Sequence, residues 1–167
     1  VMAGAGVTEP GSGTDVAGMK TRVRKEGDDY ILSGAKMWIS NLSDANWFIT
    51  FAQMDPALKH RGISAFIVPA DAPGVEVHPV KNKTGFRPLA TGELVLNDVR
   101  LPKEQLVGAE GEGFKVAMCA VENGRLGVAA RAVGVLQACL DDALSYANQR
   151  ETFGQPIGKY QLVQSHI

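Results

Sequence analysis

The chain has few cysteines and histidines and no excess of either charge. Among its 167 residues are two cysteines, three histidines, 17 lysines and arginines and 18 aspartates and glutamates. Two cysteines are too few for a disulfide framework, so we expect Cys119 and Cys139 to be core thiols in a reducing compartment. The histidines, His60, His78 and His166, lack metal-ligand spacing. The balanced charge argues against general binding to nucleic acid or an acidic membrane surface. We therefore expect no metal site and no nucleic-acid partner.

Long apolar runs are also missing. No segment approaches the roughly 20 apolar residues that span a membrane. The first residues carry no basic region and no Met at position 1, so we expect no signal peptide and interpret the sequence as part of a longer chain. A hydrophobic content of 45% and a charged content of 21% are typical of a globular protein with a core.

Short alternating segments occupy residues 19 to 98. The expected strands are 19–25, 30–40, 46–54, 63–69, 75–80 and 92–99, with turn residues such as Gly27 and Gly74 between them. Short strands at this spacing favour an antiparallel sandwich or barrel.

The periodicity changes after Pro102. A linker at 107–113 contains three glycines, and from 114 to about 149 apolar residues recur mostly every three or four positions. This pattern predicts a helix about 50 Å long, at 1.5 Å per residue. An 80-residue β domain cannot cover such a helix, so it requires partner helices that this sequence does not contain. Residues 151–159 are expected to form a loop and 160–167 to begin another helix. The fold class is therefore α+β.

One stretch, residues 7–15 (VTEPGSGTD), is rich in turn and hydroxyl residues. Gly11 and Gly13 allow the backbone to turn sharply and to approach a ligand closely. Such a loop can receive the phosphates or the polar ring edge of a nucleotide-like ligand. A polar surface turn explains the same composition. It is not a phosphate-binding loop of the nucleotide-hydrolase type, because no Gly-Lys-Ser/Thr follows.

Three segments together resemble the acyl-CoA dehydrogenase family. Residues 7–15 resemble its T-E-P-x-x-G-S-D signature, and residues 36–41 (KMWISN) resemble its K-x-[WY]-I-[ST]-N. Residues 150–154 (RETFG) with Gln161 are similar to its R-x-x-F-G…Q segment. Connecting segments at 66–69, 83–87, 97–102 and 112–114 match as well. The resemblance covers essentially the whole chain in order.

The resemblance implies a fold and a reaction. Residues 1–103 correspond to the family's middle β domain, an antiparallel barrel or sandwich, and 104–167 to the start of its C-terminal helical bundle. The implied reaction is FAD-dependent α,β-dehydrogenation of an acyl-CoA thioester, as in fatty-acid β-oxidation. A carboxylate removes the α proton, and a hydride passes from the β carbon to the flavin N5.

The resemblance also places residues of the β domain on the flavin. The backbone of Val7 and the hydroxyl of Thr8 should meet the pyrimidine side, and Ser40 should hydrogen-bond at or near N5. Trp38 offers a flat face beside the ring, with Ile39 next to it. By residue type alone, without the neighbouring motifs, an ordinary core aromatic of a strand is the favoured interpretation of Trp38.

The C-terminal segment resembles a second part of the cofactor site. Arg150 and Thr152 correspond to residues that bind the FAD pyrophosphate of a neighbouring subunit, and the Arg fork of donors suits that ligand. Phe153 and Gln161 would lie along the same cofactor. This arrangement implies at least a homodimer, and family members are usually tetramers.

The acyl-CoA substrate has its own implied contacts. Thr14 resembles a family Ser that meets the pantetheine and phosphates. Glu122 and Arg125 share a helix face at i and i+3 and would touch CoA, although a local ion pair explains their spacing too. Leu89 stands where many members have Ser, which leaves a polar contact there in doubt.

No catalytic base is expected inside the chain. A subset of the family carries its Glu on the long helix, but the corresponding position here is Gly124. We therefore expect the base beyond residue 167. We do not expect Glu9, Asp15 or Glu122 to have the burial that raises a carboxylate pKa toward neutrality.

Other functions of the same fold, and a non-catalytic role, stay open. An acyl-CoA oxidase or a flavin monooxygenase has the same fold, and a non-catalytic relative would keep the fold alone. A dehydrogenase would pass its electrons to an electron-transferring flavoprotein. The family implies the bacterial cytoplasm or the mitochondrial matrix.

Overall fold

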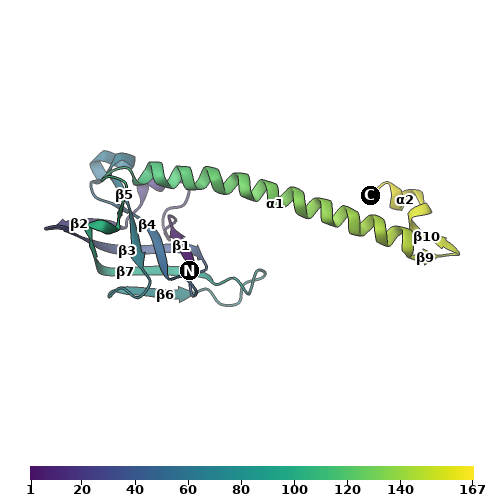
Figure 1. Ribbon diagram of the computed structural model, residues 1–167, viewed down its shortest axis with the longest axis horizontal. Helices are drawn as coiled ribbons and strands as arrows, with labels where there is room; N and C mark the ends of the chain where they lie inside the picture. The colour runs from purple at the N-terminus through teal and green to yellow at the C-terminus, as the bar shows by residue number, and fades with distance from the viewer. The chain divides into compact units, whose positions relative to one another are not determined.

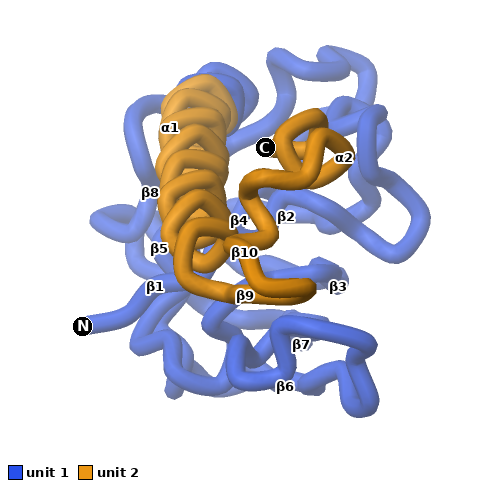
Figure 2. Tube along the Cα trace, turned by 90° about the vertical axis from the view of Figure 1, so that its right-hand side faces the viewer, with its two compact units in different colours: residues 1–119 blue, residues 120–167 orange.

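The computed structural model describes residues 1–167 and divides into two compact units. Unit 1 comprises residues 1–119 and unit 2 residues 120–167, shown in two colours in Figure 2. The long helix α1 (Gly113–Gln149) begins in unit 1 and continues in unit 2. The expected domain boundary after residue 103 stays a prediction.

Unit 1 is built on one eight-stranded sheet (Figure 1). The strands are β1 (Ala3–Gly6), β2 (Arg22–Glu26), β3 (Asp29–Ser40), β4 (Trp47–Gln53), β5 (Ile63–Pro69), β6 (Val75–Pro79), β7 (Thr91–Pro102) and β8 (Leu106–Val107). Three 3₁₀ helices lie between them, η1 (Val16–Gly18), η2 (Pro56–Gly62) and η3 (Lys103–Gln105). The strand order is β6-β7-β3-β2-β4-β5-β8, with β1 beside β4.

The α+β prediction is confirmed, with two departures in the sheet. Most neighbouring strands are antiparallel, but β1 pairs with β4 in parallel, and so does β2 through the single pair Arg22–Gln53. The expected segments missed β1 and β8. β1 consists of Ala and Gly alone and β8 has two residues, so neither carries an alternating apolar pattern.

Two buried clusters hold unit 1 together. The larger lies between the strands and includes Phe48 and Phe66, both 0% exposed. The smaller joins Phe51 and Ile63 to Ala117 in the first turns of α1. Gly113, the first residue of α1, packs closely against β5. A Cβ added to it would lie 2.5 Å from the backbone carbonyl carbon of Ser64. A side chain at residue 113 would therefore push the helix away from β5.

Unit 2 contains the remainder of α1 and a short C-terminal segment. That segment comprises β9 (Glu151–Thr152), β10 (Gln155–Pro156), η4 (Ile157–Lys159) and α2 (Gln161–Gln164). Ala147 is the one buried residue of unit 2, and most of the other apolar residues that predicted the helix are exposed there. The prediction of core thiols was wrong within this chain, because Cys119 and Cys139 are both exposed on α1. Strand pairing replaces part of the loop expected at 151–159.

Candidate functional site

A β-bulge in β3 decides which way the side chains of the K-M-W-I-S-N segment point. Lys36 pairs with Leu94, and Ile39 pairs with Gly92. Between these two pairs, β3 therefore contains one residue more than β7. Without the bulge, alternation would put Trp38 on the face of Leu32 and Lys36, which are buried. The bulge instead places Ile39 inward, at 1% exposure, and leaves Trp38 61% exposed.

The backbone at Trp38 is unusual for an aromatic residue. Its φ is 64°, in the left-handed region that bulky side chains rarely adopt. Such a conformation costs on the order of 1–3 kcal/mol and is typical of functional sites. Within this chain Trp38, being exposed, is therefore not a core aromatic of its strand. Ile39 belongs to the core cluster, so its side chain offers nothing to a ligand and only its backbone can. Ser40 is exposed at the end of β3.

Loop 7–15 begins with a tight turn. The Glu9 N–H donates to the Ser12 carbonyl at 2.9 Å, and the Ser12 N–H donates to the Glu9 carbonyl at 3.2 Å. At Gly11 and Gly13 an added Cβ would meet no atom within 4 Å, and neither residue has a positive φ. The fold of this chain therefore does not require glycine at either position. Close approach of a ligand to this backbone would explain the two glycines, which the fold of the chain does not.

Backbone contacts join this loop to the bulged part of β3. The Met37 N–H donates to the Thr8 carbonyl at 2.8 Å. The Lys36 ammonium donates to the Val7 carbonyl at 3.5 Å. The structure thus brings Val7 and Thr8, both half-buried, next to the residues that precede Trp38.

A buried ion pair lies beneath the same contacts. Lys36 Nζ is 2.8 Å from Glu9 Oε1, with the Lys36 side chain 0% and the Glu9 side chain 5% exposed. The other bonds to the Glu9 carboxylate come from the backbone N–H groups of Lys20, at 2.5 Å, and Thr21, at 2.9 Å.

The ion pair sets the ionisation of both partners. Burial raises the pKa of Glu9, but hydrogen bonds and the charge of Lys36 outweigh it, so the pKa lies below its usual range. Burial lowers the pKa of Lys36, and Glu9 opposes that shift. Glu9 is buried, which the sequence did not indicate, but its pKa is not raised toward neutrality, so the carboxylate stays ionised and is a poor general base.

The rest of the loop is open. Thr14 is exposed, as its expected role on a substrate requires. The Asp15 carboxylate accepts a hydrogen bond from the Gly18 N–H at 3.2 Å and caps η1.

Glu122 and Arg125 are both exposed on the part of α1 in unit 2. The ion pairs of the structure all lie between residues 9 and 110, so the alternative of a local pair between these two residues is not observed. Their side chains are available to a ligand.

The R-x-x-F-G segment forms a small hairpin in unit 2. Thr152 of β9 pairs with Gln155 of β10, and Phe153 and Gly154 form the turn with φ values of 50° and 79°. Two positive φ values are typical of a type I′ turn, where a bulky first residue is unusual. Phe153 is 98% exposed. Arg150 is exposed as well.

Two hydrogen bonds fix the backbone of this hairpin. The Ile157 N–H donates to the Arg150 carbonyl, and the Tyr160 hydroxyl donates to the Thr152 carbonyl, both at 2.8 Å. Gln161 follows in α2 and is exposed. The hairpin therefore presents Arg150 and Phe153 outward on a tied backbone.

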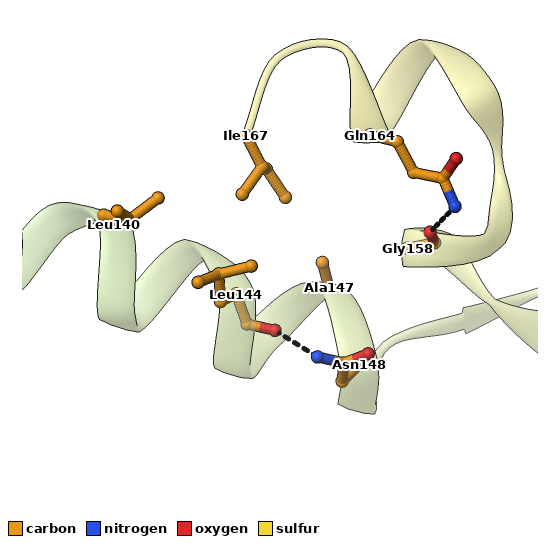
Figure 3. A pocket seen from close by; sticks show the side chains of 7 residues that line it. All are labelled: Leu140, Leu144, Ala147, Asn148, Gly158, Gln164 and Ile167. Atoms are coloured by element: carbon orange, nitrogen blue, oxygen red, sulfur yellow. Dashed lines mark hydrogen bonds between the residues drawn. The ribbon is translucent and has the colours of Figure 1, made fainter.

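A cavity of about 400 Å³ lies in unit 2 between α1 and the C-terminal segment (Figure 3). Its lining is mostly apolar and consists of Leu140, Leu144, Ala147, Asn148, Gly158, Gln164 and Ile167. None of the residues expected to bind the cofactor or substrate lines it.

No group of three or more His, Cys, Asp and Glu side chains gathers as a metal site would require. No helix combines the length and hydrophobicity needed to cross a bilayer.

Family comparisons agree with the arrangement of these segments. A family model described as the acyl-CoA dehydrogenase middle domain matches residues 4–99. A second, described as the C-terminal domain, matches residues 111–167. The chain belongs to the acyl-CoA dehydrogenase family. The resemblance drawn from the three sequence segments is thereby confirmed.

Individual acyl-CoA dehydrogenases show how much of the family protein is present. The chain is 42% identical over 158 residues to the mitochondrial short-chain specific acyl-CoA dehydrogenase of Bos taurus, covering 95% of this chain and 38% of that protein. Butyryl-CoA dehydrogenase from Megasphaera elsdenii superposes with a TM-score of 0.92 and 41% identity, over 98% of this chain and 43% of that one. A glutaryl-CoA dehydrogenase from Mycobacterium smegmatis, solved in complex with FADH2, gives a TM-score of 0.88 and 37% identity over 98% and 41% of the two chains. The chain spans about two fifths of the length of the curated relatives it matches.

Sequence reasoning did not anticipate the ion pair beneath the loop. A signal was available, because alternation from Leu32 places Lys36 on the inward face of its strand. A lysine at such a position requires a buried acceptor. Its partner, Glu9, is 27 residues away, and no local pattern connects the two.

Proposed function

We propose that this chain supplies the middle β domain and the first long helix of the C-terminal bundle of an FAD-dependent acyl-CoA dehydrogenase. The main support is that loop 7–15 is hydrogen-bonded to β3 at Met37, the residue directly before the exposed Trp38. Two segments that resemble the family's flavin-contact motifs are thus hydrogen-bonded to each other. The division after residue 103 belongs to this proposal.

The residues present are suited to a flavin. The backbone at Gly11 and Gly13 is open, the Thr8 hydroxyl can donate or accept, and the exposed Trp38 indole gives a flat apolar face. FAD, when bound, would supply the redox step by accepting the hydride from the β carbon of the substrate. Ser40 would hydrogen-bond at the reacting edge of the ring.

The hairpin of unit 2 offers a phosphate contact. An exposed Arg next to a constrained turn can bind a pyrophosphate through parallel N–H donors. In this proposal Arg150 and Thr152 hold the pyrophosphate of a neighbouring subunit's FAD, and Phe153 and Gln161 lie along it. Such a site requires a homo-oligomer, a dimer or a tetramer.

The substrate in this proposal is an acyl-CoA thioester. The exposed side chains of Thr14, Glu122 and Arg125 would contact its CoA portion. The base that removes the α proton would lie beyond residue 167, because Glu9, the one buried carboxylate among the candidates, is committed to Lys36. We propose an electron-transferring flavoprotein as acceptor, and the bacterial cytoplasm or the mitochondrial matrix as location.

The test is anaerobic reduction of the protein that contains this chain. The purified protein should retain FAD, and acyl-CoA substrates from butyryl- to palmitoyl-CoA should bleach the visible absorbance of the oxidised flavin for at least one chain length. A protein that takes up no FAD, or FAD that no acyl-CoA reduces, would overturn the proposal. Mixing the reduced protein with oxygen in a stopped-flow instrument separates a dehydrogenase, which reoxidises slowly, from an oxidase or monooxygenase.

A further inference from the structure

The Glu9–Lys36 pair lies where loop 7–15, β3 and the chain after η1 meet. Lys36 Nζ contacts the Val7 carbonyl, the Glu9 carboxylate and Met19 Sδ, the last at 3.8 Å. The Glu9 carboxylate in turn receives the backbone N–H groups of Lys20 and Thr21. One buried pair therefore ties the start of the loop, and the chain that follows η1, to β3.

We infer that Glu9 and Lys36 are positioning residues that fix loop 7–15 against β3, so that Thr8 and Trp38 keep the relation that flavin binding requires. This inference rests on the proposed function. Neither side chain is accessible enough to touch a ligand itself, since both lie under the loop with at most 5% of the side chain exposed. Their effect on the flavin would pass through the backbone of residues 7, 8 and 37.

Close packing around the lysine stem supports a fixed position. A Cβ at Gly6 would lie 3.1 Å from Lys36 Cγ, and one at Gly4 would lie 2.8 Å from Phe48 Cδ1. β1 therefore lies directly on the lysine stem before the chain enters the loop. The direction in which Val7 and Thr8 leave β1 is set by this contact and by the ammonium group beyond it.

A contribution to folding stability does not by itself explain why a buried ion pair is present here. Replacing a buried ion pair by apolar residues of similar size is often neutral or stabilising, because desolvation of two charges offsets their attraction. Apolar side chains in the same place would not orient the loop, because hydrophobic contact does not specify which carbonyl faces which donor. The pair lies beside the expected cofactor surface, where direction matters most.

The test uses the double variant Glu9→Gln/Lys36→Met in the full protein that contains this chain. Glutamine keeps an acceptor for the Lys20 and Thr21 N–H groups, and methionine keeps an unbranched stem against Gly6. The matched control is Asp28→Asn/Lys103→Met, which removes an exposed carboxylate–lysine pair of 3.0 Å. Glu9→Asp is measured alongside, because it keeps the charge but shortens the side chain by one methylene.

Four quantities are compared across these proteins: the FAD dissociation constant, the visible spectrum of bound flavin, its reduction potential, and the melting temperature without FAD. We expect the double variant to bind FAD about ten- to a hundredfold more weakly, with an altered flavin spectrum, as a displaced contact surface would cause. Glu9→Asp should show a smaller change of the same kind, and the control should match the unsubstituted protein.

A double variant that is folded, with unaltered FAD affinity and spectrum, would overturn the inference. So would a lowered melting temperature with an unaltered flavin spectrum, because the pair would then be merely structural. If the double variant does not fold, Glu9→Asp decides by the same two criteria. Failure of the proposed function is recognised separately, since the unsubstituted protein would then take up no FAD.

Discussion

Unit 1 buries most of its large apolar residues within the chain, whereas unit 2 leaves most of its apolar residues exposed to solvent. The strands of unit 1 place Phe48, Phe51 and Phe66 at 0–1% exposure. In unit 2, Leu126 and Leu136 of α1 are 75% and 70% exposed, and Ala147 alone is buried. The two units contain similar side chains in opposite environments.

The difference lies in where each element finds its partner. A β-strand pairs with strands that the same chain supplies, and the sheet then folds its apolar faces together. The long helix α1 exposes apolar residues, and the four-residue α2 is too short to cover them. Each buried Leu or Val would contribute about 1.5–3 kcal/mol, so the exposed face of α1 is a surface that requires partners. The helical bundle of the family is the source that we propose.

The largest expected effect breaks the core of unit 1. Phe48→Ala removes a fully buried ring from the main cluster and should lower the free energy of unfolding by about 3–5 kcal/mol. Urea denaturation followed by tryptophan fluorescence measures this change. A loss below about 1 kcal/mol would mean that unit 1 does not depend on this cluster.

The next effect concerns what unit 2 contributes in place of a core. Arg150→Ala in the full protein should weaken FAD binding by about 1.5–3 kcal/mol, or about ten- to a hundredfold, through loss of a charge-assisted phosphate contact. Gel filtration after dilution gives the ratio of flavin to protein. An unchanged ratio would remove Arg150 from the site, and Lys159→Ala on the neighbouring 3₁₀ helix is the control.

Acidification should weaken unit 1 through the buried ion pair. The pKa of Glu9 lies below its usual value of 4.5 in the folded state, so the folded state binds fewer protons than the unfolded one. Stability from this group is therefore complete above pH 4.5 and is lost as the pH falls through the folded-state pKa.

Melting temperatures between pH 7 and pH 3 measure this loss, which should be shallower in Glu9→Gln/Lys36→Met. Glu26, Asp98 and Glu110, whose pKa values are also lowered by nearby cations and hydroxyl groups, persist in the variant and set the remaining slope. Identical slopes in the two proteins would mean that Glu9 contributes nothing to the acid response.

The smallest expected effect is on the exposed face of α1. Leu136→Ala in the isolated chain should change the free energy of unfolding by less than about 0.5 kcal/mol, because the side chain makes few contacts to lose. The same substitution in the full protein should cost more if a helical bundle covers this face. Equal effects in both contexts would show that Leu136 stays in solvent.

Much of the fold could be predicted from the periodicity of apolar residues in the sequence. The expected strand 63–69 matches β5, and the expected helix from 114 to 149 begins one residue after α1 does. β1 and β8 escaped because an Ala-Gly repeat and a two-residue strand carry no alternation. The candidate site residues on β3 and in loop 7–15 came from family motifs, while their attachment to each other did not.

The sequence by itself determined the order of elements, because alternation and helical periodicity are local properties of the chain. It also determined the family, through motifs at suitable spacing. Tertiary structure alone decided that Trp38 points outward and Ile39 inward, since the bulge appears only when β3 is aligned with β7. It likewise decided that Lys36 is buried against Glu9, because a partner 27 residues away is chosen by the folding of β1 and β3 together. Both results depend on register between distant segments, which no local pattern specifies.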